Sequence, residues 1–130
     1  METFNEQHAV ETYKSLIAIS TEGFRALQLL NGGAIVALLT YLGHLADPAK
    51  GATKAAWPMK LFIAGLVVGT LAFATSYLTQ LALYNESVLG DEYQGPRHGW
   101  ALWTTMSLAL ASAGAFAWGA FAALTTLSQS

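Results

Sequence analysis

The sequence has no cysteine and little charge. Of its 130 residues, 11% are charged and 54% are hydrophobic, whereas a soluble domain carries about 25% charged residues. Without cysteine the chain can form no disulfide, thiolate metal site or thiol nucleophile. A formal net charge of −2 gives no basic surface for nucleic acid. The composition therefore argues against a soluble enzyme, a disordered chain and a nucleic-acid-binding protein.

Charge is also missing from three long stretches of the chain. No Asp, Glu, Lys or Arg occurs between Arg25 and Asp47, between Lys60 and Glu86, or after Arg97. Each stretch exceeds the roughly 20 apolar residues that a helix needs to cross a bilayer core. We therefore predict an all-α membrane protein, one domain over residues 1–130, with transmembrane helices at 24–46, 58–86 and 98–127.

The first transmembrane helix is expected to continue an N-terminal amphipathic helix outside the membrane, at residues 1–23. One helical stripe runs through both parts, because apolar or small residues recur every three or four positions. Its members are Val10, Tyr13, Ile17, Ser20, Phe24, Leu27 and Asn31. Asn31-Gly32-Gly33 would signal a hairpin in water, but a turn in hydrocarbon would leave backbone groups unpaired. One continuous helix over about residues 5–45 is therefore predicted.

Proline and glycine mark the expected ends of the other two helices. Asp47-Pro48 ends the first span, and residues 49–57 form a basic linker. Pro58 suits the first turn of the second helix, which is predicted over about residues 58–88. Gly90-Asp91 and Gly95-Pro96 indicate a surface loop, and the third helix follows over about residues 97–127.

Neither the N-terminal segment nor the distribution of basic residues determines the orientation of the protein in the membrane. The N-terminal 22 residues hold four acidic residues and one lysine, unlike a secretory signal, which begins with basic residues. The basic residues divide evenly between the two sides of the predicted membrane. The side that carries the N-terminus has Lys14, Arg25 and Arg97, and the other side has Lys50, Lys54 and Lys60. The positive-inside rule therefore leaves the orientation open. We expect an integral protein of the bacterial inner membrane.

Catalytic and metal-binding groups are missing from the predicted membrane interior. No charged side chain lies deep in a span, where proton relays and ion-coupled carriers place one. His8, His44 and His98 lie near helix ends or outside the bilayer, so no two of them can hold one haem. We expect no catalytic residue, no metal site and no cofactor, and therefore no enzymatic activity.

Polar side chains gather in the membrane half nearer the N-terminus. This polar layer consists of Gln28, Asn31, Tyr77, Gln80, Tyr84, Thr104 and Ser107. Gln28, Asn31 and Gln80 could hydrogen-bond one another and hold the helices together, because a buried amide in lipid needs a partner. Alternatively, the layer lines a water-filled vestibule above an apolar constriction. At the rim of the layer, Arg25 could pair with Glu86 or with Glu22.

Small residues recur at the spacing that brings membrane helices close together. Gly65 and Gly69 form a GxxxG pair, and Gly33 and Ala37 have the same spacing. The third span has a small residue at every fourth position, namely Ser107, Ala111, Ala115, Gly119 and Ala123. Packing inside one bundle needs only one or two such rows of small residues. The additional rows suggest contact with a second chain.

Together these features favour a non-enzymatic membrane protein that assembles into a homo-oligomer and forms or gates a pore. A pore requires several copies, because three helices cannot enclose a solute path. The alternative is an accessory or assembly subunit of a larger membrane complex, docked through its alanine-rich helix. A carrier or membrane enzyme is disfavoured by the missing charges and bases. The expected partners are the lipid bilayer and a second copy or a partner membrane subunit, and no nucleic acid.

Overall fold

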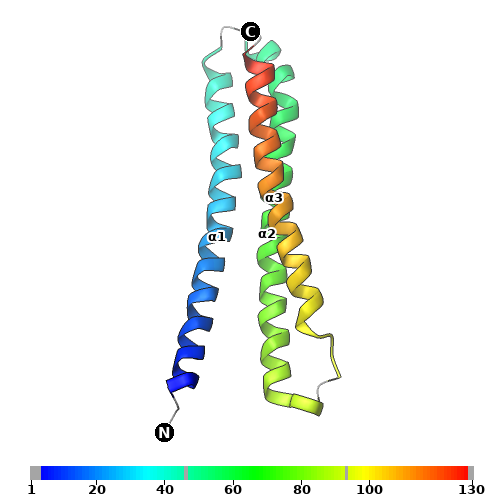
Figure 1. Cartoon of the computed structure of the whole chain (residues 1–130). Helices are drawn as coiled ribbons and strands as arrows, with labels where there is room; N and C mark the ends of the chain where they lie inside the picture. The colour runs from blue at the N-terminus through cyan, green and yellow to red at the C-terminus, as the bar shows by residue number, and fades with distance from the viewer. Residues whose placement is uncertain (1–3, 46, 93, 129–130) are drawn as a thin grey trace.

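The computed structural model describes residues 4–45, 47–92 and 94–128. Figure 1 shows three long helices running side by side: α1 (Phe4–Gly43), α2 (Pro48–Leu89) and α3 (His98–Leu127). A short 3-10 helix, η1 (Gly90–Glu92), follows α2. Each of the three α-helices is long and apolar enough to cross a membrane. The predicted fold class is confirmed, and the described part of the chain contains no strand.

Helix α1 passes through Asn31-Gly32-Gly33 without a break, as predicted. It has 40 residues, or about 60 Å at 1.5 Å per residue, twice the ~30 Å of a hydrocarbon core. This length leaves room for the extramembrane segment expected at residues 1–23. Of that segment, residues 1–3 lie outside the described part of the chain.

The predicted start of the second helix at Pro58 is wrong. Helix α2 begins at Pro48, and Pro58 lies buried inside it. The predicted linker at residues 49–57 is therefore helical. The side chain of Asp47 caps the helix by accepting a hydrogen bond from the Lys50 backbone nitrogen at 3.3 Å. Pro48 then occupies the first turn, where a missing N–H costs nothing. Both prolines could start a helix, and the Asp47 cap decides for the earlier one.

The most extensive interface joins α2 to α3. Buried α2 residues recur at alternating spacings of four and three, with one final step of seven, which is the 3.5-residue period of a coiled-coil seam. They are Gly51, Ala55, Pro58, Phe62, Gly65, Gly69, Ala72 and Thr79. The buried residues of α3 are Ala101, Thr105, Ser112, Gly119 and Ala122. Most members of both rows are small, so the two backbones can approach closely.

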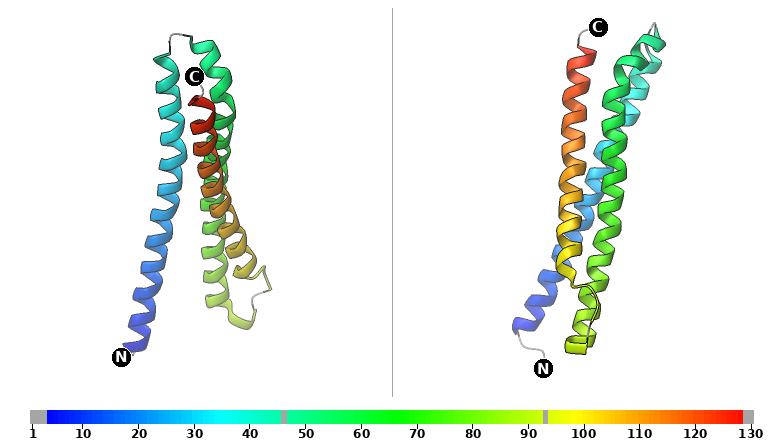
Figure 2. Two further views of the ribbon diagram at one scale, coloured as in Figure 1. Left: turned by 45° about the horizontal axis from the view of Figure 1, so that its top comes forward. Right: turned by 90° about the vertical axis from the view of Figure 1, so that its right-hand side faces the viewer.

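Helix α1 packs closely at only one end. It lies near α2 and α3 beside the connection to α2 and diverges from them toward its N-terminus (Figures 1 and 2). An apolar cluster around Leu38, Ala55 and Phe62 fills the close end, and Ile35 and Phe116 pack against it. Contact between α1 and α3 is slight overall. This apolar cluster therefore lies at the end of the bundle where α1 is close to α2 and α3.

Large apolar side chains cover the outside of the bundle. Leu110 is 72% exposed and Trp103 70% on α3, and Leu29 is 69% exposed on α1. Soluble monomers rarely expose a continuous apolar surface of this kind. Because lipid is as apolar as these side chains, such a surface is expected of helices in a bilayer. The chain is an integral membrane protein by this architecture.

Candidate functional site

Three amides of the polar layer form hydrogen bonds between helices, although not with one another. Gln28 on α1 donates to the Thr70 hydroxyl on α2, with 2.8 Å between Nε2 and Oγ1. Gln80 on α2 accepts a hydrogen bond from the Tyr13 hydroxyl on α1. The expected mutual bonding of Gln28, Asn31 and Gln80 is therefore wrong. Each amide instead hydrogen-bonds to a residue of a neighbouring helix, and the three pairs lie at different levels along the bundle.

Asn31 is fully buried where the three helices meet. Its Nδ2 donates to the backbone oxygen of Leu27 at 3.0 Å and to Ser112 Oγ on α3 at 3.4 Å. Ser112 in turn donates to the backbone oxygen of Gly65 on α2 at 2.8 Å. Asn31 Oδ1 has no hydrogen-bond partner among the described residues and lies against Gly65. This network joins α1, α2 and α3 through two side chains.

The predicted packing residues divide between the interior and the outer surface. A Cβ at Gly65 would collide with Asn31, one at Gly69 would lie 2.9 Å from Ser112 Oγ, and one at Gly119 would lie 2.8 Å from the Phe62 ring. These three glycines therefore permit the close helix contacts.

The remaining predicted packing residues are more exposed. Gly33, Ala37 and Ala111 face outward, and Ala115 is half-buried. The buried seam of α3 passes through Ser112 and Gly119 rather than along Ala111 and Ala115. A 3.5-residue period selects these positions, whereas a strict four-residue ridge drifts around the helix.

The other members of the polar layer do not converge on the amides. Tyr77 and Tyr84 are 66% and 64% exposed on α2, and Ser107 is exposed on α3. Thr104 is half-buried and donates to the backbone oxygen of Trp100 at 2.9 Å. The polar layer thus consists of an inner hydrogen-bonded set and an outer exposed set.

Arg25 and Glu86 do not form the expected rim pair with each other. Arg25 pairs with Glu22 at 3.6 Å, the alternative partner weighed from the sequence. Neighbouring Phe24 stacks edge-on against Phe73, with ring centroids 6.0 Å apart. Arg25 is therefore level with Phe73, which precedes Glu86 by about 20 Å along α2. The axial offset of the helices excludes the Arg25–Glu86 pair.

Glu86 instead joins the end of α2 to the start of α3. One carboxylate oxygen accepts from the His98 backbone nitrogen at 2.6 Å, and the other lies 2.7 Å from His98 Nδ1. His98 is the first residue of α3, so Glu86 satisfies an otherwise unpaired N–H of that helix. An acidic group is also favourable at the N-terminus of a helix.

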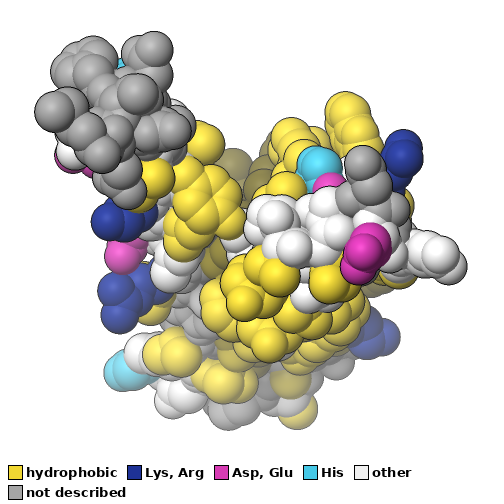
Figure 3. Space-filling model, turned by 90° about the horizontal axis from the view of Figure 1, so that it is seen from below, with side chains coloured by type: hydrophobic (Ala, Val, Ile, Leu, Met, Phe, Trp, Pro, Cys, Tyr) yellow, Lys and Arg dark blue, Asp and Glu magenta, His cyan; other side chains and the backbone are white. Residues whose placement is uncertain are grey.

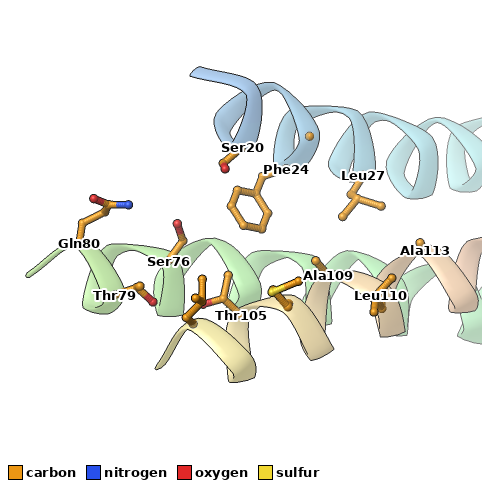
Figure 4. Close-up of a pocket in the computed structure, with 13 residues that line it drawn as sticks. Ser20, Phe24, Leu27, Ser76, Thr79, Gln80, Thr105, Ala109, Leu110 and Ala113 are labelled. Atoms are coloured by element: carbon orange, nitrogen blue, oxygen red, sulfur yellow. The ribbon is translucent and has the colours of Figure 1, made fainter. Parts of the chain in front are cut away.

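A groove lies between diverging α1 and the α2–α3 pair. Its volume is about 450 Å3. Figure 3, the view onto this end of the molecule, shows it as a hollow with hydrophobic side chains on both sides. Its polar end is lined by Ser20, Ser76, Thr79, Gln80 and Thr105, and its apolar end by Phe24, Leu27, Met106, Ala109, Leu110 and Ala113 (Figure 4).

Gln80 alone among the groove residues belongs to the polar layer predicted from the sequence. Ser76 precedes Gln80 by four residues, and this spacing alone predicts that the two share one face of α2. Ser20 contributes to the groove from α1, where it is a member of the N-terminal stripe. Its position opposite Ser76 depends on the divergence of α1, which no local pattern encodes.

The described lining of the groove contains no charged residue. Throughout the described residues, no group of three or more His, Cys, Asp or Glu could hold a metal ion. The chemistry available in the groove is hydrogen bonding from hydroxyl and amide groups at one end and apolar contact at the other.

Comparison with protein-family models, with curated proteins and with solved structures finds no match to this chain. Its function is therefore inferred from its own residues and their geometry.

Proposed function

We propose that the protein is a non-enzymatic component of the bacterial inner membrane that assembles into a homo-oligomer enclosing or gating a small pore. One observation carries this proposal: small residues remain on the outer surface after the bundle has formed. Gly33 and Ala37 are exposed on α1, and Ala111, Gly114 and Ala117 are exposed on α3. A Cβ at Gly33 or Gly114 would meet nothing within 4 Å.

These exposed positions support association because of how helices pack in lipid. Lipid is as apolar as leucine, so helices associate through close backbone packing and hydrogen bonds rather than hydrophobic burial. Inside the chain, Gly65, Gly69 and Gly119 already provide that close approach. Gly33 and Ala37 have the same four-residue spacing on α1 and contribute nothing to the internal seam. A second copy can use this face without disturbing the bundle.

The outer polar residues support the pore part of the proposal. Tyr77 and Tyr84 are seven residues apart, so they share one exposed face of α2. In an oligomer, such a face can border a water-filled path between copies. Gln28 and Asn31 bond within the bundle, and we assign them a structural role.

The mass of the purified protein in mild detergent tests the assembly. We expect a discrete oligomer from the wild-type chain and a monomer from the Gly33→Leu/Ala37→Leu variant. Val36→Leu is the matched control, because Val36 is 62% exposed on the same helix and already bulky. A monomeric wild-type chain that gains order only with another polypeptide would favour the accessory-subunit alternative.

Ion flux through liposomes tests the pore separately. We expect flux with the wild-type chain and altered flux with Tyr77→Leu or Tyr84→Leu. Gln28→Leu should lower stability without changing ion selectivity, because its amide joins α1 to Thr70 of α2 in the same chain. A discrete oligomer without flux would overturn the pore and leave the assembly in place.

A further inference from the structure

The groove beside α1 is amphipathic along its length. Hydroxyl and amide groups gather at one end, and Phe24, Leu27 and Leu110 line the other. No charged side chain is among the described lining residues. Its volume of about 450 Å3 falls within the roughly 300–1,000 Å3 of known small-molecule sites. The groove therefore suits an uncharged polar group that is attached to an apolar tail.

Two hydrogen-bond donors at the polar end are available to a ligand. Among the described residues, neither Gln80 Nε2 nor the Ser76 hydroxyl has a hydrogen-bond partner. Figure 4 shows the Ser76 hydroxyl and the Gln80 amide nitrogen turned toward the space between α1 and α2. The Tyr13 hydroxyl holds Gln80 Oε1 from the other side, which leaves Nε2 directed at the groove. A ligand placed here would need an acceptor oxygen.

The length of the groove suits a hydrocarbon chain. Its lining runs along α3 from Leu102 to Ala113, which is about 16 Å. A chain attached to a polar group can lie along this length, with the polar group beside Gln80 and the chain against Leu27 and Leu110.

The depth of the polar end matches the boundary between lipid headgroups and hydrocarbon. Lys60 is the last charged residue before the long apolar stretch of α2. Counted from Lys60, a core of about 30 Å covers about 20 residues and ends near Gln80. At that boundary the ester carbonyls of glycerolipids lie, each at the head of an acyl chain that points into the core.

We propose that the groove binds one acyl chain of a membrane glycerolipid, whose ester carbonyl accepts hydrogen bonds from Gln80 Nε2 and Ser76 Oγ. The chain lies between α1 and the α2–α3 pair, against Phe24, Leu27 and Leu110. The acyl chain fills the space between α1 and α3, which make little contact with each other. Tyr13 acts as a positioning residue, because its hydroxyl sets the orientation of the Gln80 amide.

Native mass spectrometry of the full-length protein with two defined lipids tests the proposal. The probes are diacyl phosphatidylcholine and its dialkyl ether counterpart, which have equal chain lengths and differ in the carbonyl oxygens. We expect the wild-type protein to bind the ester lipid about tenfold more tightly, the effect of one or two neutral hydrogen bonds. Equal binding of the two lipids would overturn the proposal.

Two variants separate the hydrogen bonds from the shape of the groove. Gln80→Leu should reduce the preference for the ester lipid, because only the Ser76 donor remains, while ether-lipid binding stays unchanged. Ala109→Phe should fill the groove and abolish retention of both lipids. The matched control is Ala120→Phe, at an exposed position of the same helix outside the groove, which should retain them. Equal lipid retention by the two phenylalanine variants would contradict the proposal.

Circular dichroism and thermal unfolding establish that each variant is folded. If Ala109→Phe fails to fold, the comparison of wild type with Gln80→Leu decides alone.

Competition with a short-chain benzoquinone tests the identity of the ligand, because a quinone also presents carbonyl acceptors on an apolar tail. A benzoquinone that displaces the ester lipid at equal concentration would overturn the assignment to a glycerolipid.

Discussion

The side chain of Asn31 on α1 occupies the space that a side chain at Gly65 of α2 would need. Both residues are buried, and the Asn31 carbonyl oxygen lies against Gly65. Ser112 of α3 completes the contact by donating to the Gly65 backbone oxygen and accepting from Asn31. One glycine thus allows a polar side chain to join three helices at a single level.

Gly65→Ala is expected to destabilise the bundle by about 1–3 kcal/mol, the usual cost of overpacking a close-packed interior. The added Cβ would collide with Asn31, which is held by hydrogen bonds and packed on all sides. Equilibrium unfolding in mixed detergent micelles measures the change. The matched control is Gly32→Ala, where a Cβ meets nothing within 4 Å. This control should be neutral or stabilising by up to ~1 kcal/mol.

The Asn31→Ala/Gly65→Ala double variant should lose less stability than the two single variants added together. Shortening Asn31 makes room for the new methyl group, so the two changes compensate. Strict additivity, or a Gly65→Ala variant as stable as Gly32→Ala, would show that the two residues are not in contact.

Ser112→Ala is expected to lower the unfolding free energy by about 0.6 kcal/mol and by no more than ~1.7 kcal/mol, the range measured for hydrogen bonds between membrane helices. The variant removes the donor to Gly65 and the acceptor for Asn31. Ser107→Ala on the exposed face of the same helix is the control and should have no effect. Equal effects at the two serines would speak against the buried network.

Glu86→Ala is expected to loosen the first turn of α3. Both carboxylate oxygens lie against His98, one on its backbone nitrogen and one on its ring. Without them the first N–H of α3 loses its partner. Amide hydrogen exchange over residues 98–101 should accelerate, while exchange in the middle of α3 stays slow. Glu92→Ala, at an exposed position of η1, serves as the comparison and should leave this turn unchanged.

Ser15→Cys and Ser128→Cys are expected to react with a membrane-impermeant thiol reagent from opposite sides of the membrane. Figure 1 places the N-terminal end of α1 and the C-terminal end of α3 at opposite ends of the bundle. The native chain has no cysteine, so labelling carries no background. Sealed vesicles labelled before and after permeabilisation give the result. Labelling of both positions from one side would contradict three spans.

Much of the fold was predictable from the sequence. The uncharged stretches mark three spans, and backbone chemistry in hydrocarbon forces a helix through Asn31-Gly32-Gly33. The predicted start of α2 at Pro58 is wrong because Pro48 and Pro58 are both suited to the first turn of a helix. The side chain of Asp47 caps the helix and so fixes its start at Pro48. Local patterns thus predicted which segments are helical but not every boundary.

The candidate site depended on how the helices pack against one another. The sequence alone determined that the membrane interior lacks charge and that amides and glycines lie within the spans, because these are properties of single positions. Only the tertiary structure decided that Gln28 meets Thr70, that Gly65 accommodates Asn31, and that Arg25 is too far from Glu86. The axial offset and divergence of α1 set these pairings. Such rigid-body relations arise from all contacts along a helix together, so no short segment of the chain encodes them.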